Sequence, residues 1–187
     1  MPLVDGLFTV AGLPAHPLLV DAVAVLLPLA AVCSVGLAVH RGARRRFGWP
    51  VLVLTAVAVV AVPLADATGE QLRDHLPAPN PLLAMHEAQG KLLLPYALGF
   101  GVTVVLLVVA GRLADRERAA TARPANGTDE TAVVSTTWRR ISVLASVLVI
   151  GMSVVTTVDV VRIGTTGAQA VWQGVTGQGV TGQGMAH

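Results

Sequence analysis

The hydrophobic residues of the chain gather into four long blocks instead of alternating with polar residues. The blocks run over about 17–39, 49–65, 92–111 and 141–158. A helix needs roughly 20 apolar residues to cross about 30 Å of hydrocarbon, and each block is close to that length. The pattern therefore predicts an all-α, integral membrane four-helix bundle surrounded by the lipid bilayer.

Polar residues extend the predicted helices beyond the blocks. Asp66, Glu70 and Arg73 follow the second block on one helical face, and Asn80-Pro81 is typical of a helix start. We expect a four-span domain over 1–172, with helices at about 17–40, 49–76, 81–112 and 139–163 and a polar loop before the last. The tail, 173–187, is Gly-rich with a repeated VTGQG, which predicts disorder.

Composition and charge agree with membrane insertion. Of the 187 residues, 53% are hydrophobic and 13% charged, whereas about a quarter of a soluble domain is charged. Arginines cluster after the first block and between the third and fourth, so the positive-inside rule predicts both termini to be extracytoplasmic in a multi-pass cell-membrane protein. The +2 net charge is explained by this topology, and no nucleic-acid partner is expected.

Polar side chains of all four helices are predicted to form one layer near the external surface. At 1.5 Å per residue, Asp21, Asp66 and Asp159 lie at similar depth above the cytoplasmic side. In a hairpin of the second and third helices, Lys91 falls level with Asp66. We therefore expect an Asp66–Lys91 ion pair, with Asp159 in the same structural ion-pair layer.

Two kinds of cofactor site are open for this layer. His16, Asp21, Glu70 and His86 could ligate a transition metal, because imidazole and carboxylate are suitable donors. Alternatively, His16 and His86 could hold a haem axially from two helices. No HxxxH, ExxH or CxxCH spacing selects either site, and an ion-pair network that orients the helices needs no ligand.

Three stretches carry a resemblance to a known family. GLPAHPLLVD, TGEQLRDHL with LLAMHEAQGK, and TTGAQAVW resemble the bacterial membrane proteins grouped as domain of unknown function 2231, over about residues 12–172. The resemblance implies a four-helix membrane domain without an established activity. The family's opening motif has His-Pro and then a second His, but Asp21 stands at that place here, which favours a harder metal or no metal over bis-imidazole haem.

The sequence thus predicts a multi-pass membrane protein, with a small haem- or metal-binding redox subunit as the first hypothesis. One alternative is a structural or interaction module, without cofactor, that packs against a membrane partner or a second copy. Another is a proton- or solute-handling protein. No nucleophile–base arrangement is present, so no catalytic residue is assigned and binding is favoured over enzymatic activity.

Overall fold

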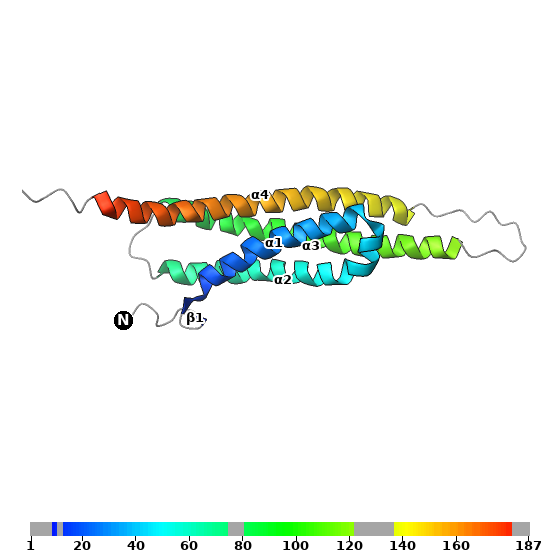
Figure 1. The fold of residues 1–187 in the computed structure, drawn as a ribbon, viewed down its shortest axis with the longest axis horizontal. Helices are drawn as coiled ribbons and strands as arrows, with labels where there is room; N and C mark the ends of the chain where they lie inside the picture. Colours follow the sequence, from blue (N-terminus) through cyan, green and yellow to red (C-terminus); the bar gives the residue numbers. More distant parts are fainter. Residues whose placement is uncertain (1–8, 11–12, 75–80, 122–136, 181–187) are drawn as a thin grey trace, which may run out of the picture.

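Four long helices make up almost all of the described chain. The structure is a computed structural model that describes residues 9–10, 13–74, 81–121 and 137–180. The helices are α1 (Ala15–Val39), α2 (Arg41–Asp74), α3 (Pro81–Thr121) and α4 (Thr137–Val180), and they lie along one common long axis (Figure 1). Each is long and apolar enough to cross a membrane, so the predicted all-α four-span architecture is confirmed.

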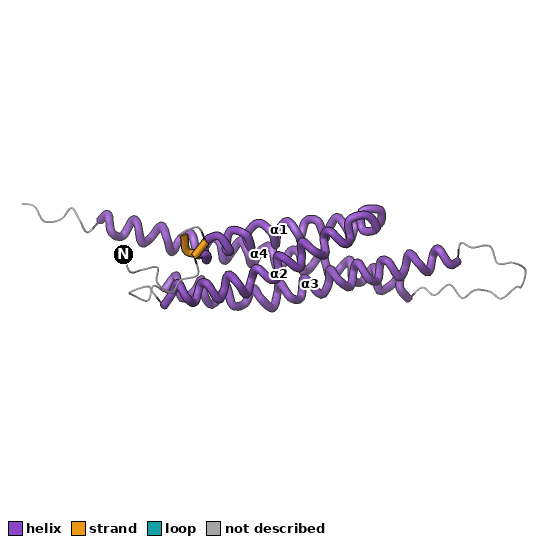
Figure 2. Tube along the Cα trace, turned by 90° about the horizontal axis from the view of Figure 1, so that it is seen from below, coloured by secondary structure: helices purple, strands orange, loops and turns teal. Residues whose placement is uncertain are grey.

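The helices form a ring of neighbours. Both α1 and α3 pack against α2 and α4, so α1 and α3 occupy opposite corners of the bundle. Ahead of α1, an antiparallel ladder pairs β1 (Thr9–Val10) with β2 (Leu13–Pro14). Figure 2 shows this ladder, in orange, beside the helical bundle.

The junction of α1 and α2 is tighter than the sequence suggested. α2 begins at Arg41 instead of near residue 49, and only His40 separates it from α1. The His40 amide donates to the Gly36 carbonyl at 2.9 Å, and the Arg44 amide donates to the His40 carbonyl at 3.0 Å. Helical hydrogen bonds therefore continue on both sides of the junction.

Two helices also extend further than expected. α3 runs to Thr121 instead of about 112, because Asp115 binds arginines of α2 and holds the added turns against the bundle. α4 runs to Val180, so residues 173–180 are helical where a disordered tail was expected. An existing helix gains a hydrogen bond with each added residue, which favours such extension. The remaining loop and tail residues, 122–136 and 181–187, lie outside the described part.

The core combines small residues with one large aromatic ring. Phe100 is fully buried together with Leu27, Leu107 and Val149, and Ala97 lies among them without exposure. Small residues let membrane helices approach closely, and this matters because dispersion contacts drive their association in lipid.

The outward faces of the helices are as apolar as the core. Large apolar side chains more than half exposed occur on every helix, among them Val32, Val53, Val102 and Leu144. A helix that is hydrophobic all round is typical of a membrane span, where lipid covers the outer face. These side chains are therefore the lipid-facing surface.

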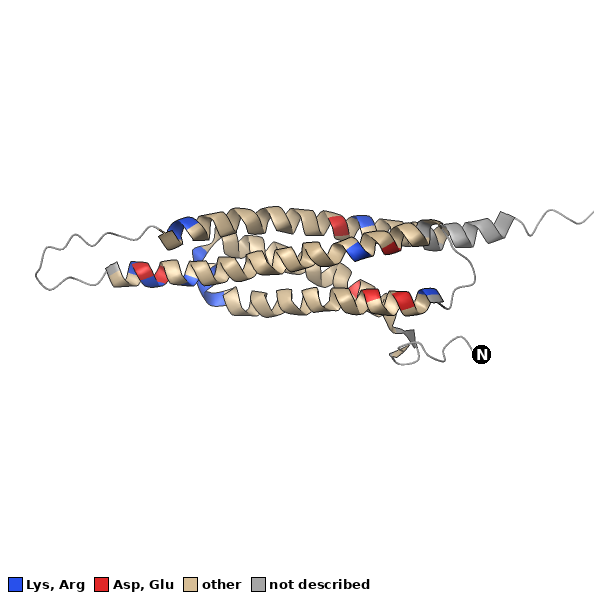
Figure 3. Cartoon of the chain, turned by 180° about the vertical axis from the view of Figure 1, so that it is seen from behind, with Lys and Arg blue, Asp and Glu red and all other residues tan. Residues whose placement is uncertain are grey.

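The charged side chains gather towards the two ends of the bundle and leave the middle apolar (Figure 3). We call one end the arginine end, which holds Arg41, Arg44, Arg45, Arg46, Arg112, Arg116, Arg118, Arg139 and Arg140. We call the other the histidine end, which holds His16, Asp21, Asp66, Glu70, Arg73, His86, Glu87, Lys91, Asp159 and Arg162. Since the bundle has four antiparallel helices, α1 begins and α4 finishes at the histidine end (Figure 1).

Candidate functional site

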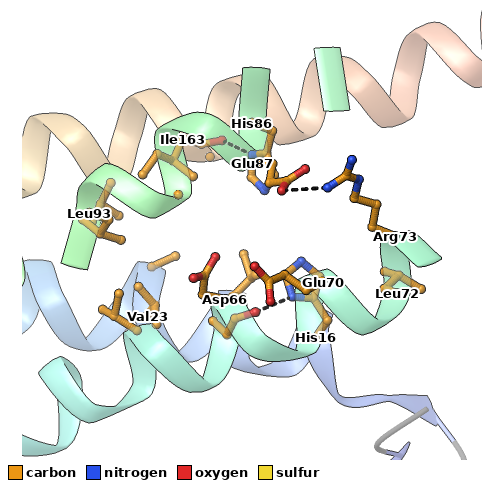
Figure 4. A pocket seen from close by; sticks show the side chains of 18 of the residues that line it. His16, Val23, Asp66, Glu70, Leu72, Arg73, His86, Glu87, Leu93 and Ile163 are labelled. Carbon is orange, nitrogen blue, oxygen red and sulfur yellow. Dashed lines mark hydrogen bonds and ion pairs between the residues drawn. The ribbon is translucent and has the colours of Figure 1, made fainter. Parts of the chain in front are cut away.

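A cavity at the histidine end is lined by residues of all four helices. His16 comes from α1, Asp66 and Glu70 from α2, His86 from α3 and Ile163 from α4 (Figure 4). Most of the remaining wall is apolar or glycine: Val20, Val23, Ala24, Val62, Ala65, Gly69, Leu72, Leu83, Gly90, Leu93, Val160 and Gly164. The cavity thus combines two imidazoles with a largely hydrocarbon wall.

His16 is held against α2 by a backbone hydrogen bond. Its Nδ1–H donates to the carbonyl oxygen of Ala65 at 2.9 Å. Gly69, one turn further along α2, provides the space for the ring, because a Cβ there would lie 2.9 Å from Cε1 of His16. The Thr68 hydroxyl donates to the same Ala65 carbonyl at 3.0 Å.

His86 is held against α4 in the same way. Its Nδ1–H donates to the carbonyl oxygen of Ile163 at 3.1 Å. Gly167 lies one turn further along α4, and a Cβ there would be 3.0 Å from Cε1 of His86. The Thr166 hydroxyl donates to the Ile163 carbonyl at 2.9 Å and also contacts Gln89 Oε1 at 2.8 Å.

In both hydrogen bonds Nδ1–H is the donor, because the partner is a carbonyl oxygen. A neutral imidazole that donates from Nδ1 has its lone pair on Nε2, where it can ligate a metal. A backbone carbonyl bonded to the other nitrogen is the usual support of a metal-ligating histidine. His16 and His86 are therefore both arranged as ligands would be, and they project from opposite corners of the bundle.

Ion pairs cross the rim of the cavity from α2 to α3. Arg73 lies 3.0 Å from Glu87, and Lys91 lies 3.0 Å from Glu87 and 3.5 Å from Glu70. Lys91 thus pairs with Glu70 and Glu87 instead of the expected Asp66. The depth count placed Lys91 and Asp66 at one level, but Glu87 lies one turn before Lys91 on the same helix face and is the nearer partner.

The three aspartates of the predicted layer lie in different surroundings. Asp66 lines the cavity, whereas Asp21 is exposed and is not among the lining residues. Asp21 lies five positions after His16, which turns the two side chains about 140° apart around α1. Asp159 is half-buried outside the lining, and its Oδ2 is buried without a hydrogen-bond partner among the described residues.

The predicted metal ligands are only partly brought together. His16, Glu70 and His86 line one cavity, and Asp21 does not. Among the described residues, no group of three or more His, Cys, Asp and Glu side chains is close enough to hold a metal ion. The arrangement is a pair of imidazoles from opposite corners, with carboxylates at the rim.

Sequence reasoning assigned no role in the site to the glycines and threonines that lie against the imidazoles. These residues are Thr68 and Gly69 on α2, and Thr166 and Gly167 on α4. A signal was present, because TGEQ at 68–71 and TGAQ at 166–169 are two copies of one Thr-Gly-x-Gln pattern. This internal repeat identifies the second helix of each hairpin.

Comparison with known protein families identifies the chain as a membrane protein, in agreement with its four apolar helices. The family model described as "Predicted membrane protein (DUF2231)" matches residues 12–179. The chain belongs to this family. The match includes all four spans and both histidines, so the cavity lies within the matched part of the chain. No curated protein and no solved structure matches the chain.

Proposed function

We propose that this protein is a small haem-binding redox subunit of the membrane, with His16 and His86 as the axial ligands. The observation that carries the proposal is the matched pair of imidazoles. Both line one cavity, and each is bonded through Nδ1 to a backbone carbonyl. Axial ligation by two histidines on different helices of a bundle is an established way to hold haem in proteins.

The surroundings favour haem over a bare metal ion. A transition-metal ion in a structural or catalytic site takes three or four protein ligands, whereas bis-imidazole haem takes two. The described residues supply two imidazoles but no cluster of three ligands. Glu70 is engaged by Lys91 at the rim, and Asp21 lies outside the lining. The absence of a second histidine at position 21 therefore does not weaken the axial pair.

Haem binding requires the cavity to widen at its rim. Its volume is about 130 Å³, which is smaller than a porphyrin. In this proposal the apolar wall and the rim, where Arg73 and Lys91 bridge α2 and α3, would together enclose the haem. These ion pairs involve exposed basic groups, and exposed pairs stabilise a protein by only about 0–1 kcal/mol. They can therefore separate at little cost.

The roles of the protein groups follow from this placement. Haem, when bound, supplies reversible one-electron transfer. The carbonyls of Ala65 and Ile163 orient the two rings, and the apolar wall excludes water from the ligands. Because an electron carrier needs a donor and an acceptor, the proposal implies a membrane protein partner or a second copy of the chain.

An absorption spectrum of purified protein tests the proposal. The protein is produced with haem available, purified in mild detergent and compared with His16→Ala, His86→Ala and the control His40→Ala. We expect a Soret band in the wild type and in the control, because His40 is exposed at the junction of α1 and α2. In both cavity variants we expect at least about tenfold less haem per protein.

Four outcomes would contradict the haem proposal. A folded, colourless wild-type protein would show that no haem is bound. An unchanged Soret band in both cavity variants would show that His16 and His86 are not the ligands. Near-stoichiometric metal without a Soret band would favour an ion site instead. A colourless, metal-free protein that copurifies with a membrane partner would favour the structural or interaction module.

A further inference from the structure

The two helical hairpins carry the same hydrogen-bonding unit. Each unit has a histidine on the first helix, a carbonyl acceptor on the second, and a Thr-Gly pair three and four residues after the acceptor. The units are His16, Ala65, Thr68 and Gly69, and His86, Ile163, Thr166 and Gly167. In both units the carbonyl accepts from the histidine and from the threonine.

The two units also agree in their distances. A Cβ at Gly69 would lie 2.9, 3.2 and 3.6 Å from Cε1, Nδ1 and Nε2 of His16. A Cβ at Gly167 would lie 3.0, 3.2 and 3.8 Å from the same atoms of His86. The corresponding values differ by 0.1, 0.0 and 0.2 Å. Because α1 and α3 run in the same direction, the α1–α2 hairpin is related to the α3–α4 hairpin by an approximate twofold rotation about the bundle axis.

We propose that Gly69 and Gly167 are positioning residues for the two imidazoles, and that the cavity between them is a twofold site for a ligand with two equivalent faces. Each glycine lets a ring approach the helix closely enough for its Nδ1–H to reach the carbonyl one turn earlier. A side chain there would push the ring away from this carbonyl. The released imidazole would lose both its fixed tautomer and the orientation of Nε2.

Two glycines that line the cavity have a different environment from Gly69 and Gly167. Gly90 on α3 and Gly164 on α4 line the cavity, but a Cβ at either position would meet nothing within 4 Å. An alanine at either position would therefore not contact an imidazole. They are matched controls for Gly69 and Gly167, because all four are glycines within the described helices.

This inference deepens the proposed function and rests on it for the identity of the ligand. A planar haem presents the same kind of face to both axial positions, as a twofold pair of imidazoles requires. The positioning of the rings is a property of the protein without haem. It can therefore be tested whether or not haem binds.

The first test is a coupling measurement on haem-free protein in detergent. Gly69→Ala is expected to lower the melting temperature by about 2–8 °C, as overpacking of a tight contact does. Adding His16→Ala removes the ring that the new methyl group meets, so the double variant should lose none of this stability relative to His16→Ala alone. The same cycle is expected for Gly167→Ala with His86→Ala, whereas Gly90→Ala and Gly164→Ala should show no coupling to either histidine.

A variant that does not fold still gives a result. Recovery of folded protein when His16→Ala is added to Gly69→Ala supports the inference, and persistent misfolding of the double variant contradicts it. A second readout is the ¹⁵N spectrum of histidine-labelled protein. We expect Gly69→Ala to shift the ring nitrogens of His16 and leave those of His86 unchanged, with the reverse for Gly167→Ala.

Haem binding completes the experiment and separates the two proposals. With haem supplied, Gly69→Ala and Gly167→Ala should each weaken binding by about 10–100-fold, as loss of a ligand's supporting contacts does. If no haem binds but the coupling is present, the proposed function fails and the positioning role remains. If haem binds to His16 and His86 without coupling to the glycines, the positioning role fails and the proposed function remains.

Discussion

One carboxylate organises three arginines at the arginine end. Asp115 Oδ1 accepts from Arg41 and Arg118 at 2.9 Å each, and its Oδ2 accepts from Arg45 at 2.7 Å. The Asp115 side chain is only 13% exposed, and Arg44 is buried beside it. Guanidinium groups held this close repel one another, so the carboxylate offsets a repulsion as well as forming hydrogen bonds.

This cluster predicts a salt-dependent loss of stability when Asp115 is neutralised. Asp115→Asn keeps the size of the side chain but removes its charge. We expect a loss of about 1–3 kcal/mol in the free energy of unfolding. The loss should be larger at low salt than at high salt, because salt screens the repulsion among the arginines. Thermal unfolding in detergent at two salt concentrations measures both effects.

The matched control is Asp21→Asn at the opposite end of the same bundle. Asp21 is exposed and has no ion pair or hydrogen bond with the described residues, so its neutralisation should leave stability within about 0.5 kcal/mol of wild type. Equal effects of the two substitutions would show that Asp115 has no special role in holding α2 against α3.

At the scale of elements, two glycines bring α2 and α3 together at the arginine end. A Cβ at Gly48 would lie 3.3 Å from Val108 Cγ1, and a Cβ at Gly111 would collide with the Arg44 side chain at Nε. Close helix approach at small residues is the usual packing mode of membrane helices. Arg44 can be buried because α3 presents no side chain at position 111.

We therefore expect Gly111→Ala to destabilise the bundle by about 1–3 kcal/mol through displacement of Arg44. Gly151→Ala on α4 is the control, since a Cβ there meets nothing within 4 Å and alanine favours a helix by up to about 1 kcal/mol. Unfolding in a detergent or denaturant series compares the two. Equal or greater stability of the Gly111 variant would mean that Arg44 can leave its site without cost.

The elements also show what the sequence could predict. The four spans follow from apolar blocks of membrane length, which is a property of the chain alone. The added turns of α3 depend on Asp115 reaching arginines on α2, and no local pattern reports such a contact. The sequence pattern therefore predicted which segments are helical more accurately than it predicted the residues at which the helices end.

The candidate site was predictable in part for the same reason. Depth along a helix follows from residue counts, which predict His16 and His86 at one level, and the structure has both lining one cavity. The direction of a side chain around its helix depends on which face of the helix packs against its neighbours. For this reason Asp66 lines the cavity and Asp21 does not. The residue count could not identify the partner of Lys91, because several carboxylates lie at a similar depth. The carboxylate that lies 3.0 Å from Lys91 is that of Glu87, one turn earlier on the same helix.

At the scale of the whole molecule, the two ends of the bundle differ in charge. The arginine end carries most of the basic residues, and the histidine end carries the cavity and most of the carboxylates (Figure 3). Basic segments are retained on the cytoplasmic side during insertion. We therefore expect the arginine end to face the cytoplasm, with the cavity and both termini on the opposite side.

Cysteine labelling in intact cells tests this orientation. Cys33 is replaced by alanine, and single cysteines are introduced as Gly42→Cys at the arginine end or Thr165→Cys at the histidine end. Both positions are exposed, and a Cβ at Gly42 meets nothing within 4 Å. A membrane-impermeant thiol reagent should label the Thr165 variant in intact cells, and the Gly42 variant only after the membrane is opened.

Labelling after permeabilisation is the internal control, since both cysteines should then react to a similar extent. Early labelling of the Gly42 variant alone would reverse the orientation and place the cavity on the cytoplasmic side. The result matters for the redox proposal, because orientation decides which electron donors can reach the rim formed by Arg73, Glu87 and Lys91. With the arginine end inside, a donor or acceptor in solution would meet His16 and His86 from the external side, and a cytoplasmic one would need the membrane partner.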